Sequence, residues 1–169
     1  MNVLLVSSKY PPEYSGSGFR AHNTYKRLKK QFNIKFIVLA SSITHPKSRK
    51  YVYDSVPVHI ISNKISALKT NQDFGYYNKI IRKFYNIYQY LIETIPVLFF
   101  LYQHRKIDLI HVFGNVNVTS AAITFSKIFK VPIIIEIVNL SEKPSYIEPS
   151  IIRKFLGSGY PKHAQIVAI

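Results

Sequence analysis

The chain has 169 residues, 47% of them hydrophobic, which is enough for one domain with a real hydrophobic core and at most a fraction of a second. It contains no cysteine, so disulfides and thiolate metal sites are excluded. The formal net charge of +15 favours polyanionic partners, namely nucleic acid, anionic lipid headgroups or phosphorylated substrates, although a solvated basic surface would give the same composition.

Targeting and membrane-spanning signals are weak in this sequence. The first residues lead directly into an apolar strand, without the basic n-region and cleavage site of a signal peptide. The longest apolar run, Ile95 to Tyr102, contains Pro96 and is far shorter than the ~20 residues that span a bilayer. We therefore expect no transmembrane helix and a cytoplasmic location.

Short apolar runs predict six strands, at about 2–7, 34–40, 56–61, 109–113, 131–138 and 165–169. Most of these runs are continuous rather than alternating, which is typical of strands buried on both faces of a parallel sheet. Helical patterns separate most of them. The predicted fold class is therefore α/β, a Rossmann-like three-layer sandwich with a mostly parallel sheet.

Three helices can be placed by their apolar spacing. The first has one apolar face, made of Ala21, Tyr25, Leu28 and Phe32. A long helix at about 76–102 has a predicted buried stripe of Tyr77, Ile81, Phe84, Tyr88, Leu91, Ile95 and Leu98, with a bend at Pro96. A third, at about 118–129, begins with small residues, Ser120 to Ala122, that allow close docking on the sheet.

Two polar segments interrupt the succession of predicted strands and helices, namely residues 41–55 and 66–75. Both are candidates for mobile functional loops. The last predicted strand coincides with the final residues, Ala164 to Ile169. Because chains rarely end inside a core strand, we expect this sequence to be a truncated chain or an excised domain.

The segment between the first strand and the first helix contains Gly16-Ser17-Gly18, followed by Arg20. Its residue types match a dinucleotide-binding fingerprint. However, about eight residues separate it from the strand, and no ribose-binding acid follows at the expected distance. A nicotinamide cofactor is therefore not expected. Glycines at a helix N-terminus still favour the approach of an anion or a sugar to backbone N–H groups, unless they form an ordinary turn.

Two polar residues lie within apolar strands. Glu136 interrupts the run from Val131 to Val138, and a buried carboxylate needs either a structural cation or a role in a site. His111 ends the fourth main strand and is more often a hydrogen-bonded core residue than a catalytic one. Carboxylate pairs for glycoside hydrolysis, clustered metal ligands and a G-x-S-x-G motif are not found in the sequence.

Four segments in order resemble the N-terminal domain of family 4 retaining glycosyltransferases with the GT-B fold. They are Val3–Val6 with Tyr10-Pro11-Pro12 and the glycine segment, Lys106–Val112 (K-I-D-L-I-H-V), Val131–Leu140 (V-P-I-I-I-E-I-V-N-L) and Ala164–Ile169 (A-Q-I-V-A-I). Two departures from the family pattern are the glycine pair split by Ser17 and Gln165 in place of an aspartate.

The resemblance implies that residues 1–169 are an acceptor-side domain, with the donor-binding domain and its E-x7-E motif absent from the chain. The implied reaction moves a sugar from a nucleotide-sugar co-substrate to a glycan or lipid-linked acceptor, with no metal or other cofactor, in cell-surface polysaccharide synthesis. It places Gly16, Ser17 and Gly18 at the donor diphosphate and Arg20, Asn115, Glu136 and Asn139 on the acceptor side. Catalytic residues are left unassigned, and the isolated domain is expected to be inactive.

The alternative is a basic, non-enzymatic module that binds an anionic membrane or nucleic acid. Nucleic acid is not expected, because most aromatic residues fall on predicted core stripes rather than among exposed cations. Membrane attachment is compatible with the enzyme, through basic outer faces formed by Lys26, Lys29 and Lys30 and by Lys79, Arg82 and Lys83.

Overall fold

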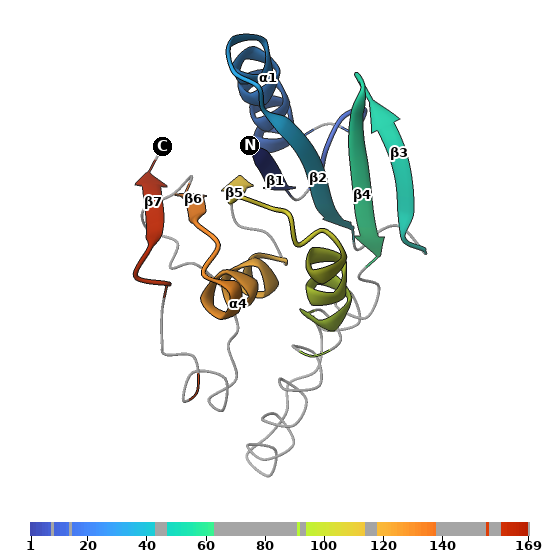
Figure 1. The fold of residues 1–169 in the computed structure, drawn as a ribbon. Coiled ribbons are helices and arrows are strands. Elements are labelled where there is room, and N and C mark those ends of the chain that lie inside the picture. Colours follow the sequence, from blue (N-terminus) through green and yellow to red (C-terminus); the bar gives the residue numbers. More distant parts are fainter. Residues whose placement is uncertain are drawn as a thin grey trace.

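The computed structural model describes residues 1–7, 9–13, 15–42, 47–62, 91, 94–113, 118–137, 155 and 160–168 (Figure 1). Helices and strands carry the labels of Figure 1. In chain order they are β1 (Asn2–Ser7), α1 (Gly16–Gln31), β2 (Lys35–Ser42), β3 (Arg49–Tyr53), β4 (Val56–Ser62), β5 (Leu109–Phe113), α4 (Thr119–Phe129), β6 (Ile133–Ile137) and β7 (Ala164–Ala168). Residues 94–103 are also helical.

The strands form one seven-stranded sheet in the order β3-β4-β2-β1-β5-β6-β7. All neighbouring pairs are parallel except β3 and β4, which are antiparallel. All six predicted strands are present, with ends that differ by at most two residues from the predicted ones. Strand β1 is buried on both faces, as its continuous apolar run predicts, whereas β7, at the edge of the sheet, leaves Ile166 and Val167 exposed.

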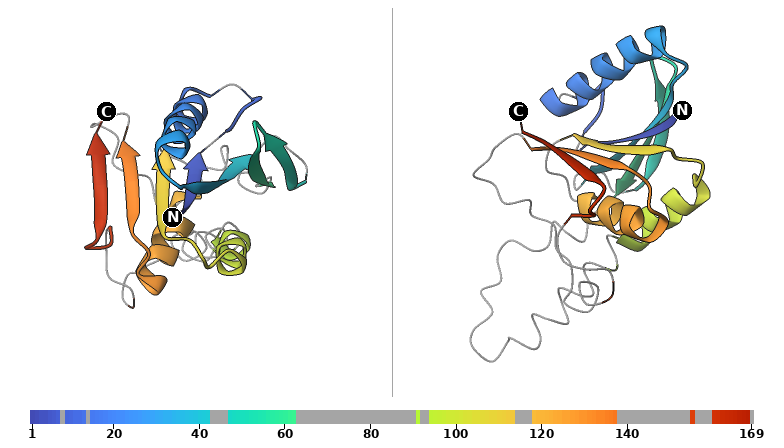
Figure 2. Two further views of the ribbon diagram at one scale, coloured as in Figure 1. Left: turned by 45° about the horizontal axis from the view of Figure 1, so that its top comes forward. Right: turned by 60° about the vertical axis from the view of Figure 1, so that its left-hand side comes forward.

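The six parallel strands follow the doubly wound order 3-2-1-4-5-6, which reverses direction between β1 and β5. Helix α1 lies on one face of the sheet, and α4 and helical residues 94–103 lie on the other (Figure 2). The predicted α/β class is confirmed, and the fold is Rossmann-like.

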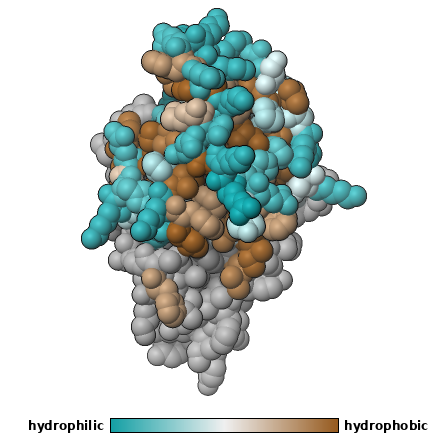
Figure 3. All heavy atoms as spheres, viewed as in Figure 1, coloured by the Kyte–Doolittle hydropathy of each residue, from teal (hydrophilic) through white to brown (hydrophobic). Residues whose placement is uncertain are grey.

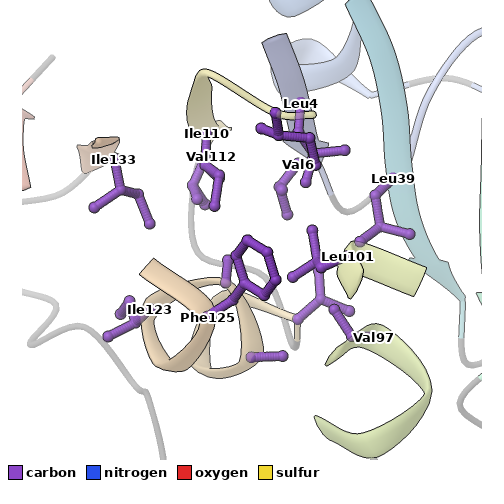
Figure 4. Packing of buried hydrophobic residues seen from close by; sticks show 14 of the residues in the cluster. Leu4, Val6, Leu39, Val97, Leu101, Ile110, Val112, Ile123, Phe125 and Ile133 are labelled. Carbon is purple, nitrogen blue, oxygen red and sulfur yellow. The ribbon is translucent and has the colours of Figure 1, made fainter. Parts of the chain in front are cut away.

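Each face of the sheet has its own hydrophobic core, because successive side chains of a strand point to opposite faces. Leu4 and Val6 of β1 pack toward α4 and residues 94–103, in the cluster shown in Figure 4. Val3 and Leu5 pack on the α1 side, against Ala21 and Tyr25. The small residues at the start of α4, Ser120 to Ala122, are buried, as predicted for close docking.

The polar segment 41–55 is not a loop throughout, which corrects the sequence prediction. Its second half is strand β3, which pairs antiparallel with β4 through a two-residue turn at Asp54 and Ser55. Both turn residues have positive φ, 48° and 62°, as such hairpin turns require. The basic composition of this segment hid its strand pattern, in which Tyr51 and Tyr53 are half-buried and the residue between them is exposed. Segment 66–75 lies outside the described residues.

Of the stripe predicted for the long helix, the structure confirms Leu98, which packs against the core, and contradicts Leu91 and Ile95. Leu91 and Ile95 are exposed, whereas Thr94, Val97 and Leu101 are buried. A strict seven-residue repeat drifts by about 20° per heptad around a straight α-helix, so it does not stay on one side of the helix. The earlier members of the stripe, residues 77–88, lie outside the described residues.

Candidate functional site

The candidate site lies where the winding of the sheet reverses, at the carboxyl ends of β1, β5 and β6. In doubly wound sheets the ligand binds in the crevice at this point. Ser7, Phe113 and Glu136 occupy one row across the three strands, because Ser7 is in register with Phe113 and Phe113 with Glu136. Ser7 is two positions after Leu5, so its side chain points to the same face of the sheet, and the residues in register with it do the same. This is the face that α1 covers.

A chain of hydroxyl groups joins the end of β1 to the start of α1. Buried Ser7 donates its hydroxyl hydrogen to the Lys9 carbonyl at 2.8 Å, and its Oγ lies 3.3 Å from Ser17 Oγ. Ser17 Oγ is 2.9 Å from Ser15 Oγ, which caps the helix by accepting the Gly18 N–H at 3.2 Å. These hydroxyl groups hold the N-terminus of α1 beside the carboxyl end of β1. The N–H groups of the first helical turn point out of the helix there.

The two glycines of this segment have different structural roles. Gly16 is exposed, and a Cβ added there would meet nothing within 4 Å. Gly18 is buried, and a Cβ there would lie 2.4 Å from the Lys9 carbonyl oxygen. Gly18 therefore lets α1 pack against the segment after β1, while the first turn at Gly16 and Ser17 stays accessible.

Arg20 and Glu136, both predicted for the acceptor side, are brought together by the fold. Arg20 Nη2 lies 2.5 Å from Glu136 Oε2, and the Arg20 guanidinium lies 5.9 Å from the centre of the Phe113 ring. From the sequence, Glu136 could either pair with a structural cation or take part in a site. The structure shows that its cationic partner is Arg20. Burial raises the pKa of the Glu136 carboxyl, and the nearby Arg20 charge opposes this rise.

His111 extends this pair into a buried polar cluster. Its Nδ1 lies 2.9 Å from the Tyr25 hydroxyl, and its Nε2 lies 3.5 Å from Glu136 Oε1. Burial, aided by the Arg20 charge, lowers the pKa of His111 to about 4, so the ring is neutral at physiological pH. The contacts fit a tautomer in which Nδ1 accepts from Tyr25 and Nε2–H faces Glu136.

Two buried nitrogen atoms of this cluster, Arg20 Nε and His111 Nε2, have no hydrogen-bond partner among the described residues. Leaving a buried donor unpaired is costly, so each of these two atoms calls for an explanation such as a bound water, an ion or a role in a site. Together with the Glu136 carboxylate, they offer two donors and an acceptor in a small volume. A ligand with several hydroxyl groups has the matching donors and acceptors.

The other predicted site residues, Asn115 and Asn139, lie outside the described residues. The sequence favoured a core role for His111 over a catalytic one and did not mark Ser7 or Tyr25 as site residues. Their signal was their place in the sequence. Ser7 is the last residue of β1 and His111 is a polar residue in the middle of β5, and these are the two strands on either side of the point where the strand order reverses. Tyr25 could be found only by its spacing on the apolar face of α1.

Within the described ranges there is no group of three or more His, Cys, Asp or Glu side chains that could hold a metal ion. No helix in that part of the chain is both long and apolar enough to cross a membrane. The fold and site define a Rossmann-like α/β domain with a polar cluster at its topological switch point. No family model matches the chain, and no curated protein matches it.

Proposed function

We propose that this chain is the acceptor-side, N-terminal half of a retaining glycosyltransferase of the GT-B type, a three-layer α/β domain that works with a separate donor-binding domain. The observation that carries the proposal is the Arg20–Glu136–His111 cluster at the switch point, beside the N-terminus of α1. A hydroxyl-binding cluster next to a helix N-terminus suits a sugar-transfer site, where an acceptor hydroxyl and a donor diphosphate must meet.

In this proposal the polar cluster holds the acceptor. Glu136 accepts a hydrogen bond from an acceptor hydroxyl, and Arg20 and His111 Nε2 donate to neighbouring oxygens. The first turn of α1, at Gly16 and Ser17, faces the donor diphosphate, and the leaving diphosphate is stabilised by N–H groups and cations without a metal. Asn115 and Asn139 belong to the acceptor side by resemblance, and Gly18 contributes by letting α1 approach.

The proposed partners are a nucleotide-sugar donor and a glycan or lipid-linked acceptor. The proposed location is the cytoplasmic side of a membrane, to which the protein attaches peripherally, with a role in cell-surface polysaccharide synthesis. A non-enzymatic basic module remains the second candidate, favoured by the net charge of +15. In that second candidate, the Arg20–Glu136–His111 cluster binds no ligand.

The test uses the full-length protein with a panel of UDP- and GDP-sugars and lipid-linked or glycan acceptors. We expect sugar transfer with retained anomeric configuration, measured by nuclear magnetic resonance of the product. The Glu136→Gln variant should raise the KM for the acceptor about 10-fold or more, because a charge-assisted hydrogen bond contributes roughly 1.5–3 kcal/mol. The KM for the donor should change little.

Asp54→Asn is the matched control, since it also removes one carboxylate charge but lies in the β3–β4 turn, where Asp54 pairs with Lys26 and His22. It should leave both KM values unchanged, and asparagine tolerates the positive φ of this turn. Transfer by no donor–acceptor pair, or a Glu136→Gln effect confined to the donor, would contradict the proposal.

A further inference from the structure

Exposed apolar side chains form a stripe along helical residues 94–103, on the side turned away from the sheet. Ile95, Phe99 and Tyr102 are 56%, 61% and 51% exposed, while Val97 and Leu101 on the opposite side are buried in the core. Spacings of four and three residues place the exposed three on one side of the helix. Solvent-facing helix surfaces are normally polar, so an apolar stripe of this length indicates a contact surface.

Cations frame one end of this stripe. The Arg105 guanidinium lies 5.2 Å from the centre of the Tyr102 ring, and Lys106 follows directly; both residues are exposed. Beside them a groove of about 510 Å³ opens between the end of the helix and the amino ends of β1 and β2. Val3, Phe36 and Ile107 line the groove, together with Lys35. Figure 3 shows hydrophobic residues reaching the surface among hydrophilic ones across the middle of this view.

An apolar stripe bordered by cations matches the interface of an anionic bilayer in both of its chemical layers. Apolar and aromatic side chains enter the boundary between headgroups and acyl chains, and lysine and arginine contact the phosphates. The net charge of +15 adds a long-range attraction to such a surface. A protein partner would need a matching apolar groove with acidic edges, whereas an anionic bilayer supplies both features over any area.

The basic face of α1, predicted from sequence as a membrane contact, also has local structural roles, and the other predicted basic face, Lys79, Arg82 and Lys83, lies outside the described residues. Lys26 pairs with Asp54, and Lys29 and Lys30 lie in the last turn of α1, where cations offset the helix dipole. Helix α1 lies on the opposite face of the sheet from residues 94–103 (Figure 2). One flat bilayer cannot contact both faces at once.

We propose that helical residues 94–103, together with Arg105 and Lys106, form the surface that docks on an anionic phospholipid bilayer. Ile95, Phe99 and Tyr102 enter the interfacial layer, and Arg105 and Lys106 contact lipid phosphates. This docking goes beyond the proposed glycosyl transfer and does not depend on it, because it requires neither donor nor acceptor. Its tests therefore use vesicles alone and fail or succeed separately from the transfer assay.

The first test exploits the absence of tryptophan from the chain. A Phe99→Trp variant carries a single fluorescent reporter on the stripe, and Phe32→Trp is its control, since Phe32 is similarly exposed, at 58%, at the end of α1. With vesicles of phosphatidylglycerol in phosphatidylcholine, the Phe99→Trp emission should shift to the blue and be quenched by brominated acyl chains. The Phe32→Trp emission should show neither change. Equal quenching of the two reporters, or quenching of the control alone, overturns the proposal.

The second test compares two pairs of cations by co-sedimentation with the same vesicles. Arg105→Gln with Lys106→Gln should lower the partition coefficient about 25-fold at low salt, roughly fivefold for each charge. Lys29→Gln with Lys30→Gln removes the same net charge from the other face and should lower it less than threefold. Binding of the unmodified protein should weaken as salt rises, because the attraction is screened.

Removing the apolar side chains completes the set. Ile95→Ser with Phe99→Ser should reduce binding at least 10-fold while circular dichroism stays unchanged, because both side chains are exposed. Light scattering identifies the competing occupant, a second copy of the chain. A dimer that the Ile95→Ser, Phe99→Ser variant dissociates, without vesicle binding by the unmodified protein, overturns the proposal. So does an equal loss of binding in the two cation pairs.

Discussion

At the scale of single residues, His111 is the group from which we expect the clearest pH dependence of stability. Burial lowers its pKa to about 4 in the folded protein, whereas an unfolded histidine titrates near 6.5. Between these values unfolding takes up a proton, so the free energy of unfolding falls as the pH falls. Glu136 acts in the opposite sense, because burial raises its pKa and the folded state then binds its proton more readily.

We predict that a His111→Asn variant loses much of this acid sensitivity. Asparagine can still accept a hydrogen bond from the Tyr25 hydroxyl but does not titrate. Between pH 7 and pH 4 the unmodified protein should lose up to about 3 kcal/mol more stability than the variant. Urea denaturation at a series of pH values measures the difference. Parallel stability curves for the two proteins would show that the imidazole does not titrate as its burial requires.

The Arg20–Glu136 pair shows how much the sequence around one residue can predict about its environment. A glutamate within an apolar strand predicts that a partner exists, because burying an unpaired carboxylate is costly. The partner, Arg20, is 116 positions away in the chain. Only the register of β6 beside β5, and the position of α1 over that face, decides which of the many cations of the chain reaches it.

At the scale of elements, the start of α1 separates packing from ligand approach. Gly18 packs against the Lys9 backbone, whereas Gly16 faces open space. The sequence treats the two glycines alike, since both fit a loop that approaches a diphosphate. Their difference arises from the path of the segment after β1, which crosses α1 at Gly18 and leaves Gly16 free.

We predict opposite effects for alanine at these two positions. Gly18→Ala should destabilise the domain by about 1–3 kcal/mol, because its Cβ overlaps the Lys9 carbonyl and the backbone must shift. Gly16→Ala should leave stability unchanged or raise it slightly, since alanine is the better helix former. Chemical denaturation of both variants measures this. If the proposed donor site is correct, Gly16→Ala should raise the donor KM of the full-length enzyme without loss of stability.

Helical residues 94–103 show a limit of periodicity at the same scale. Apolar residues lie on both the buried and the exposed sides of this helix, so an apolar count cannot tell which stripe faces the core. Packing against Leu4, Val6 and Val112 selects the side of Val97 and Leu101. The remaining apolar stripe is the one for which we propose a bilayer as the partner.

At the scale of the whole molecule, the proposed division of labour predicts weak donor binding by this domain alone. Residues 1–169 would offer a nucleotide sugar only the first turn of α1 and the edge of the polar cluster. Titration calorimetry with UDP- and GDP-sugars should therefore give a Kd of order 1 mM or weaker, since few contacts remain. Micromolar binding by this chain would mean that the donor site lies in this domain, contrary to the proposal.

The sequence by itself determined the α/β class, the six parallel strands and the close docking of α4, because continuous apolar runs and small residues are local signals. It also marked Glu136 as a group that needs a partner. Tertiary structure alone decided the pairing of Glu136 with Arg20, the inclusion of His111 and Tyr25 in the cluster, the edge strand β3 and the exposed side of residues 94–103. These depend on strand register and on which helix covers which face, and both result from contacts between residues far apart in the chain.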